Sequence, residues 1–178
     1  MLRLWTWNVN GTAVWDTLAE SGIDVALLQE APPRPAAWSG MVVPDPSDGW
    51  ATAGWSAGRL RRRTAIVQVS GAVHVTPRPV GAVGDLDAAG IPVSRPGTLA
   101  AADVEVGEAS VTVVSMYGGW ERSADGRRTL YADAAAHPVL SDLSALVTSQ
   151  NSHRIIAAGD LNILNRYGEH GSADWAAR

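Results

Sequence analysis

The sequence contains no cysteine and no lysine, and each absence removes a class of chemistry. Without cysteine there is no disulfide, no thiol nucleophile and no thiolate metal site, so a bound metal would need oxygen or imidazole ligands. All 14 basic residues are arginine, which excludes Schiff-base catalysis and a phosphate-loop lysine. The remaining options for catalysis rely on carboxylates, amides, hydroxyls, imidazoles and guanidinium groups.

Long apolar runs are also missing from the chain. No stretch approaches the roughly 18 apolar residues of a membrane span, and the N-terminus enters a strand-like segment without a signal peptide's apolar region. The sequence therefore predicts a cytoplasmic protein with no membrane span, and it shows no sign of an obligate protein partner. With 178 residues, 46% of them hydrophobic, and a net charge of -4, it predicts one globular domain over residues 1–178 and no general attraction to nucleic acid.

Two buried strands with a helix between them begin the chain. Residues 2–9 alternate in side-chain direction with mostly apolar residues on both faces, which predicts an interior strand. Thr12 suits the N-cap of a short helix, and residues 24–30 form a second buried strand. Strand, helix and strand this close together predict a right-handed βαβ unit, whose parallel strands bring Asn8 and Glu30 to the same edge of the sheet.

The middle of the chain has the pattern of a β meander with turn residues between short strands. The expected elements are strands at residues 50–55, 64–69 and 72–76, an irregular loop at residues 78–97, and a hairpin of residues 98–106 and 109–117. Gly107-Glu108 provides the two-residue turn of that hairpin.

Helical periodicity replaces the β pattern over residues 127–150. The expected apolar stripe faces the sheet and consists of Leu140, Leu143, Leu146 and Val147, with Asp142, Ser144 and Ser149 on the opposite side. Because proline breaks a helix interior, Pro138 is expected near the first turn of the main helix, after an irregular or short helical approach.

A second carboxylate follows the last predicted strand. Residues 155–158 are small or β-branched and apolar, which is typical of a strand covered on both faces, and they lead into Gly159-Asp160-Leu161-Asn162. Gly159 permits a sharp turn or a close approach of a ligand, while Asp160 and Asn162 add a carboxylate and an amide. This combination suits a metal-bound or phosphate-bound oxyanion. The alternative is a β-turn in which both side chains satisfy only the local backbone.

Four separate strands thus end in Asn8, Glu30, Tyr117 and Asp160, and a sheet sandwich would gather these ends at one rim. Here the sequence resembles the endonuclease/exonuclease/phosphatase superfamily, which has the deoxyribonuclease-I-like fold. The matching segments are Trp7-Asn8-Val9-Asn10-Gly11, Gln29-Glu30, Ser115-Met116-Tyr117 and Gly159-Asp160-Leu161-Asn162. They follow the family's order and cover nearly the whole chain. The resemblance implies an α/β (α+β) fold, a two-sheet β-sandwich flanked by helices with its second sheet incomplete.

The resemblance also implies a function, the hydrolysis of a phosphate ester by in-line attack of water. Mg²⁺ or Mn²⁺ would be the cofactor, bound by Glu30 with help from Asn8, and one glutamate suffices because Mg²⁺ commonly keeps several waters. By the same resemblance Asp160 orients or activates the attacking water. Asn162 would donate to the transition-state oxyanion, and the Tyr117 hydroxyl would contact the phosphate. The expected partner is a phosphate-ester substrate, with nucleic acid among the candidates.

The sequence departs from the family pattern in two places. Past the tyrosine the family usually has Pro-Asn, whereas this chain has Gly118-Gly119-Trp120. The family's final aspartate and Ser-Asp-His motif have no counterpart before Arg178, and His170 is the only histidine after the Asp160 loop. We therefore expect residues 1–178 to be the N-terminal part of a longer protein, with an open sheet edge, an exposed apolar patch and impaired activity.

Two further interpretations compete with the hydrolase. One is a non-catalytic phosphate- or nucleic-acid-binding module on the same fold, and the other is an α/β domain whose rim residues serve only turns. Trp5 and Trp7 are expected in the core, which leaves Trp120 as the better candidate for stacking on a base.

Overall fold

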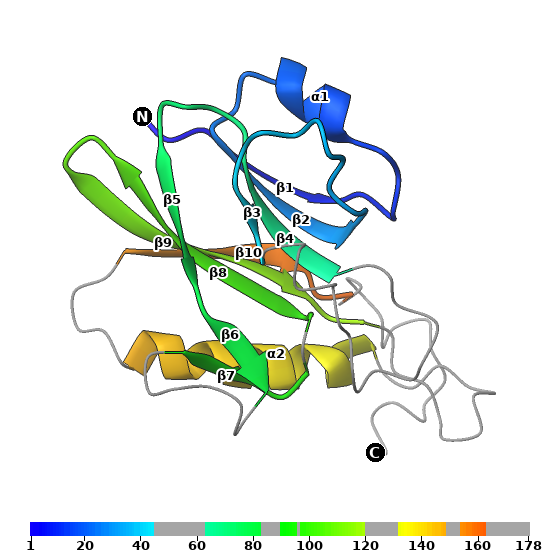
Figure 1. Cartoon of the computed structure of the whole chain (residues 1–178). Coiled ribbons are helices and arrows are strands. Elements are labelled where there is room, and N and C mark those ends of the chain that lie inside the picture. The colour runs from blue at the N-terminus through cyan, green and yellow to red at the C-terminus, as the bar shows by residue number, and fades with distance from the viewer. Residues whose placement is uncertain (45–62, 83–89, 96, 120–131, 149–153, 163–178) are drawn as a thin grey trace.

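The computed structural model describes residues 1–44, 63–82, 90–95, 97–119, 132–148 and 154–162, and every structural statement below concerns these residues. They form two four-stranded sheets that pack face to face, with helical layers outside (Figure 1). The first sheet has the order β1-β2-β4-β3, with β1 at Leu4–Asn8, β2 at Val25–Ala31, β4 at Arg63–Gln68 and β3 at Val42–Val43. The second has the order β10-β9-β8-β5, with β10 at Ile155–Asp160, β9 at Ala109–Tyr117, β8 at Leu99–Val106 and β5 at His74–Arg78.

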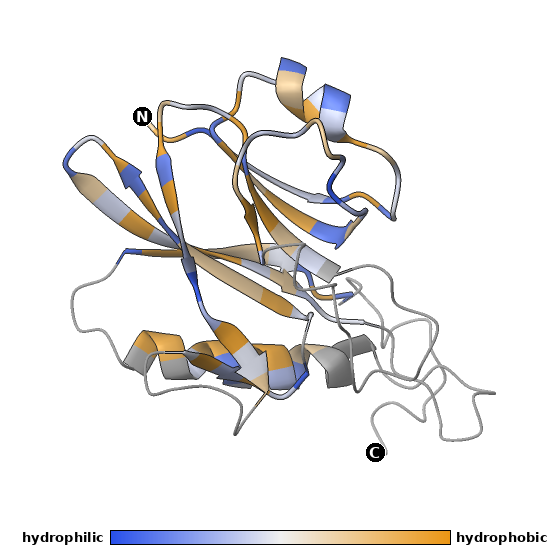
Figure 2. Cartoon of the chain, viewed as in Figure 1, coloured by the Kyte–Doolittle hydropathy of each residue, from blue (hydrophilic) through white to orange (hydrophobic). Residues whose placement is uncertain are grey.

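Helix α1 (Trp15–Glu20) covers the outer face of the first sheet, and α2 (Ala132–Thr148) covers that of the second, together with β6 (Val80–Ala82) and β7 (Ile91–Val93). Three hydrophobic clusters fill the interfaces between these layers. Strand β2 contributes to two of these clusters, because its side chains alternate between its faces. Ala26 and Leu28 pack toward α1, while Val25 and Leu27 pack toward the second sheet. Figure 2 shows the resulting hydrophobic run along β2.

The predicted βαβ unit is present, and β1 pairs with β2 in parallel. Trp15 and Leu18 bury the inner face of α1, and Gly22 adopts the left-handed conformation with φ 68° after the helix. The predicted cap at Thr12 is wrong. The helix begins at Trp15 without a side-chain cap, because the Thr12 N–H donates to the carbonyl of Val9 in a turn that follows β1.

The predicted hairpin is also present as β8 and β9, and the strands expected at residues 64–69 and 72–76 appear as β4 and β5. The segment expected as an irregular loop at residues 78–97 instead contains β6 and β7, which pair in parallel. Ile91 and Val93 are buried in the cluster under α2, so this short pair is stabilised by packing that a Pro- and Gly-rich sequence does not reveal. The strand expected at residues 50–55 lies outside the described residues.

Helix α2 differs from the prediction in the position of Pro138 and in part of its buried face. The helix runs through Pro138, because packing against the sheet outweighs one lost backbone hydrogen bond. The predicted stripe is confirmed only in part: Leu146 is buried and Leu143 packs against the same cluster, whereas Leu140 and Val147 are 45% and 55% exposed and Asp142 is buried. The cause is a specific pair of contacts: the backbone N–H and the hydroxyl of Ser94 donate to the Asp142 carboxylate at 2.9 and 2.7 Å. In the described part of the chain no helix has the length and apolarity that crossing a membrane requires.

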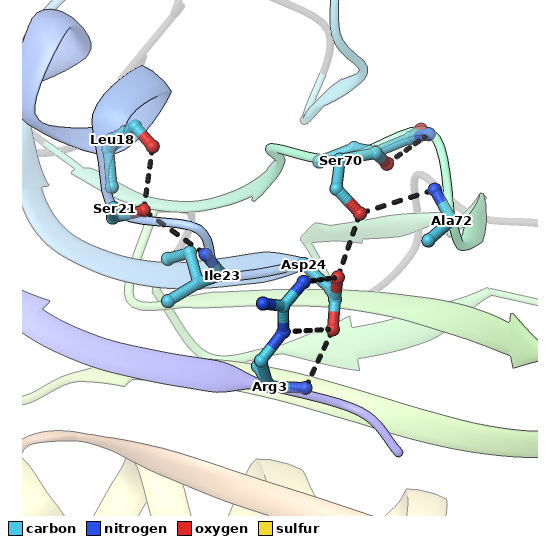
Figure 3. A network of polar contacts seen from close by, with 8 residues as sticks. Arg3, Leu18, Ser21, Ile23, Asp24, Ser70 and Ala72 are labelled. Atoms are coloured by element: carbon cyan, nitrogen blue, oxygen red, sulfur yellow. Dashed lines mark hydrogen bonds and ion pairs between the residues drawn. The ribbon is translucent and has the colours of Figure 1, made fainter.

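A charged network joins the start of β1 to β2 and to the turn after β4 (Figure 3). The buried carboxylate of Asp24 accepts hydrogen bonds from the Arg3 guanidinium at 3.0 and 3.3 Å, from the Arg3 backbone N–H at 2.8 Å, and from the Ser70 hydroxyl at 2.8 Å. These donors, the Arg3 guanidinium first, hold the pKa of Asp24 well below its usual range. Asp24 is therefore a structural anion that ties three segments of the first sheet together.

Strands β1 and β10 each pair on one side only among the described residues, so they are edge strands. Trp5 is 42% exposed, Trp7 37% and Ile156 41%. The expectation that β1 is interior with its tryptophans in the core is therefore wrong. The expected cover of β10 is partial, because Ile155 and Ala157 pack under α2 and Ala158 packs between the sheets, while Ile156 is exposed. Side-chain alternation indicates which residues share a face, but the position of a strand within its sheet depends on partners from elsewhere in the chain.

Candidate active site

The carboxyl ends of β1, β2, β9 and β10 meet at one rim of the sandwich because each sheet contributes a parallel pair. The side-chain nitrogen of Asn8 donates to Asp160 Oδ2 at 2.7 Å and to Glu30 Oε1 at 3.1 Å. The hydroxyl of Tyr117 donates to the same Glu30 oxygen at 3.2 Å. Four of the five residues predicted from the sequence thus form one connected cluster, and Asn8 and Glu30 are the neighbours that the βαβ unit predicts.

Glu30 reaches this cluster through a β-bulge. The register between β2 and β4 shifts between Leu28 and Ala31, and Glu30 has a positive φ of 53°. Strict alternation would send Glu30 to the α1 face with Leu28, but the bulge turns its carboxylate to the rim, and Ala31 joins the α1 cluster. The Gly11 N–H donates to the Glu30 carbonyl at 2.9 Å and so supports the turned backbone.

Backbone strain in the described residues is concentrated at this rim. Asn10, Glu30 and Asn162 are the non-glycine residues with positive φ, at 47°, 53° and 54°. Asparagine tolerates the left-handed region, but for glutamate it is uncommon, and such conformations cost about 1–3 kcal/mol each unless their surroundings enforce them. The unfavourable backbone of Glu30 is therefore an independent sign that the position of its carboxylate serves a function.

The Asn8 amide has a definite orientation. Its oxygen accepts the backbone N–H of Asn10 at 2.9 Å, so its nitrogen faces Glu30 and Asp160. Ligation of a metal by the Asn8 oxygen would require the amide to rotate. The metal-binding role of Asn8 stays a prediction, whereas its contact with both carboxylates is a feature of the structure.

The Gly159–Asn162 segment combines a local turn with a long-range contact. Asp160 Oδ1 accepts the backbone N–H of Asn162 at 2.8 Å, while its other oxygen reaches Asn8 in the first sheet. The Asn162 side chain donates to the Gly118 carbonyl, beside the rim. Gly159 is required because a Cβ there would overlap the backbone of Met116 on the paired strand. The turn predicted as the alternative is thus present, and it orients Asp160 toward the rim.

Sequence reasoning missed a buried polar pair directly below the rim. Gln29 and Ser115 are 1% and 0% exposed, and the Gln29 side-chain nitrogen donates to the Ser115 hydroxyl across the two sheets at 3.1 Å. The available signal was a polar residue near the end of an otherwise apolar strand, next to Glu30 in β2 and two residues before Tyr117 in β9. His170 and Trp120 lie outside the described residues.

The donor set at the rim suits a hydrated divalent cation better than a fully protein-coordinated one. Within the described ranges there is no group of three or more His, Cys, Asp or Glu side chains that could hold a metal. The rim offers instead two carboxylates, Glu30 and Asp160, that contact the same amide nitrogen. Mg²⁺ often binds through one or two carboxylates and keeps its remaining waters, so these residues fit it.

Comparisons with known proteins agree with this architecture. The chain resembles the endonuclease domain of TRAS1, a telomere-specific non-LTR retrotransposon, with 13% identity and a TM-score of 0.58 over 94% of this chain and 62% of that one. It resembles D. rerio TDP2 complexed with a single-strand DNA product, with 16% identity and a TM-score of 0.52 over 92% of this chain and 62% of that one. A D. rerio TDP2 humanized by 14 mutations gives 15% identity and the same TM-score of 0.52, over 92% and 67%.

The chain spans about two thirds or less of the length of these solved chains. No curated protein matches its sequence. At such identities the structural similarity shows the fold, which is the predicted deoxyribonuclease-I-like sandwich. The model of the endonuclease/exonuclease/phosphatase family matches residues 5–174, which include all the rim residues. This chain therefore belongs to the endonuclease/exonuclease/phosphatase family.

Proposed function

We propose that the chain carries the catalytic rim of a divalent-metal-dependent phosphoesterase that hydrolyses phosphate esters by in-line attack of water. The observation that carries the proposal is the convergence of Glu30 and Asp160, from two different sheets, on the amide nitrogen of Asn8. Membership of a family of nucleases and phosphatases supports the reaction class. The strained, bulged backbone of Glu30 supports a functional position for its carboxylate.

Glu30 is the proposed anchor for Mg²⁺ or Mn²⁺. Its carboxylate accepts hydrogen bonds from the Asn8 amide and the Tyr117 hydroxyl, which orient it at the rim. A divalent cation bound there would act as a Lewis acid toward the phosphoryl oxygens, which is worth several kcal/mol of transition-state stabilisation. Asn8 supports this site by holding Glu30 and Asp160 on one amide group.

Asp160 is the proposed residue that orients or activates the attacking water. Both of its carboxylate oxygens accept hydrogen bonds, one from Asn8 and one from the backbone of Asn162, so the group has a defined direction. A carboxylate that is already oriented by these hydrogen bonds loses little entropy when it positions a water molecule for attack.

Tyr117 and Asn162 are the proposed contacts to the phosphate. The Tyr117 hydroxyl lies beside Glu30, the proposed metal anchor, and it would be a hydrogen-bond donor to the phosphate of a bound substrate. One amide hydrogen of Asn162 is donated to the Gly118 carbonyl, so a contact to the transition-state oxyanion would use the other. The loss of a donor of this kind costs about 3 kcal/mol in comparable oxyanion sites.

A nucleic-acid phosphodiester is the first substrate class to test. Two of the similar structures are a retrotransposon endonuclease domain and a TDP2 bound to single-strand DNA. The net charge of -4 predicts weak, salt-sensitive binding instead of a strong general attraction to the polyanion.

The decisive experiment measures Mg²⁺- and Mn²⁺-dependent cleavage of bis(p-nitrophenyl) phosphate and of a single-stranded oligonucleotide by the purified chain. Glu30→Gln and Asp160→Asn should each lower metal-dependent turnover by orders of magnitude, about 10³-fold for Glu30→Gln. Glu105→Gln is the matched control, since Glu105 is an exposed acid on β8 away from the rim, and it should keep wild-type turnover.

Two other outcomes would count against the hydrolase. Binding of the oligonucleotide without turnover under any metal condition would favour the non-catalytic binding module. A melting temperature that is insensitive to Mg²⁺, with no turnover, would leave only the interpretation of the rim as turn chemistry.

A further inference from the structure

Most of the described side chains between the two sheets are apolar, and a buried polar contact lies among them just below the rim. Leu27 of β2 and Val113 of β9 belong to the hydrophobic cluster that fills this interface. Gln29 and Ser115 follow them by two residues on the same faces and are equally buried. Burying a polar pair in an apolar interface costs free energy unless its donors and acceptors are satisfied. The hydrogen bonds of Gln29 and Ser115 therefore indicate why the pair is tolerated there.

The hydrogen bonds of this pair cross the sandwich in both directions. The Gln29 side-chain nitrogen donates to the Ser115 hydroxyl at 3.1 Å, and that hydroxyl donates to the Leu28 carbonyl at 2.9 Å. The same nitrogen donates to the Leu27 carbonyl at 3.1 Å and approaches the Thr6 hydroxyl at 3.4 Å. One amide and one hydroxyl thereby join β1 and β2 of the first sheet to β9 of the second.

These strands carry the rim residues. Gln29 directly precedes Glu30, and Ser115 precedes Tyr117 by two residues on β9. In the pairing of β9 with β10, Tyr117 lies opposite Asp160, so a displacement of β9 moves both side chains together. The first sheet reaches Tyr117 and Asp160 through their hydrogen bonds with Glu30 and Asn8, and these bonds lengthen when the sheets slide.

We propose that Gln29 and Ser115 are positioning residues that set the offset of the two sheets at the rim and thereby hold Glu30 at the distance from Asp160 that metal binding requires. Hydrophobic burial has no direction of its own, whereas the hydrogen bonds from Gln29 to Ser115 and from Ser115 to the Leu28 carbonyl are satisfied only over a narrow range of offsets. The catalytic part of this inference rests on the proposed function, but the offset of the sheets does not.

The experiment compares variants that break the contact with a control that only weakens the core. Ser115→Ala removes the hydroxyl, and Gln29→Met removes the amide at nearly constant volume, leaving Ser115 its acceptor on Leu28. Ser115→Thr keeps a hydroxyl and serves as the conservative rescue. Val113→Ala is the matched control, because Val113 is buried on the same face of β9 and belongs to the apolar cluster between the sheets.

Two readouts are measured on each variant. The first is Mg²⁺ affinity from calorimetric titration with MgCl₂ alone, and the second is the pair of side-chain amide resonances of Asn8 in NMR spectra without metal. We expect Ser115→Ala and Gln29→Met to weaken Mg²⁺ binding about 10-fold or more, as loss of outer-shell partners commonly does, and to shift the Asn8 resonances. Ser115→Thr should retain both values, and Val113→Ala should lower the melting temperature while changing neither.

The proposal is overturned if Ser115→Ala and Gln29→Met keep the wild-type Mg²⁺ affinity and Asn8 resonances, or if Val113→Ala changes them as much. If Ser115→Ala does not fold, Gln29→Met decides alone, since it leaves no buried donor unpaired. A wild-type chain without Mg²⁺ affinity would refute the proposed function, and the Asn8 resonances would then still decide whether the pair sets the offset of the sheets.

Discussion

Two carboxylates lie at opposite ends of β2 and have opposite surroundings. Asp24, just before the strand, accepts hydrogen bonds from the Arg3 guanidinium and backbone and from Ser70, and its pKa is held well below its usual range. Glu30, at the other end, has a strained backbone and accepts from the neutral donors of Asn8 and Tyr117. Asp24 is matched to a positive charge within its own sheet, whereas the partners of Glu30 lie on both sheets.

The difference shows how one strand can contain a structural acid and a functional one. A carboxylate compensated by a guanidinium contributes to stability and has little remaining attraction for a cation. The Glu30 carboxylate instead accepts hydrogen bonds from an amide and a phenol on two different sheets, and it requires an unfavourable backbone conformation. Substitutions at the two ends should therefore separate stability from activity.

The largest effect is expected for Glu30→Gln on activity. Metal-dependent turnover should fall about 10³-fold, or about 4 kcal/mol, because the Lewis-acid contribution is lost with the anchoring carboxylate. The free energy of unfolding should change by less than about 1 kcal/mol, since the backbone is unaltered. Initial rates and urea denaturation of the same preparations test both statements. A large loss of stability with little loss of turnover would show that Glu30 has a structural role and not a functional one.

Gly159→Ala tests the second sheet at the rim end. The added methyl group meets backbone of Met116 and not a flexible side chain, so the free energy of unfolding should fall by about 3 kcal/mol, the upper end of the range for overpacking. Gly71→Ala is the matched control, because nothing lies near its added Cβ, and it should change stability by less than about 1 kcal/mol. Equal effects of the two substitutions in thermal or chemical denaturation would contradict the close pairing of β10 with β9.

Asp24→Asn should show the reverse of the Glu30 pattern. Removing the buried charge leaves donors of Arg3 and Ser70 poorly paired, and the free energy of unfolding should fall by about 2 kcal/mol. Turnover below the unfolding temperature should stay within about twofold of wild type, because additivity holds for sites that share no partner. Glu108→Gln, in the exposed turn between β8 and β9, is the control for charge removal and should leave both quantities unchanged.

The smallest expected effect is the loss of folding stability at low pH that depends on Asp24. The pKa of Asp24 is lower in the folded chain than in the unfolded one, so its contribution is fully present above the unfolded value of about 3.9 and is lost as the pH falls toward the folded value. Wild type should lose about 1 kcal/mol more than Asp24→Asn between pH 6 and pH 3. Urea denaturation across this range measures the difference, and parallel pH curves for the two proteins would show that Asp24 does not carry it.

Local patterns predicted the elements around the site well. The βαβ unit and the β8–β9 hairpin follow from alternation, turn residues and short connections, and they suffice to bring Asn8 beside Glu30. The orientation of α2 could not be predicted in this way, because Asp142 is buried by its contact with Ser94, a residue 48 positions away. The edge position of β1, which leaves Trp5 exposed, likewise depends on which strands pair, and the strand's own composition says nothing about that.

The sequence by itself determined the polar residues at four strand ends, the family to which they belong and the parallel pairing that gathers two of them. Only the tertiary structure decided that the β2 bulge turns Glu30 to the rim, that Asp160 meets Asn8 across two sheets, and that Gln29 and Ser115 join those sheets. The reason is physical: backbone propensities and side-chain periodicity act over a few residues, whereas the offset between sheets is set by contacts between residues about 90 to 150 positions apart.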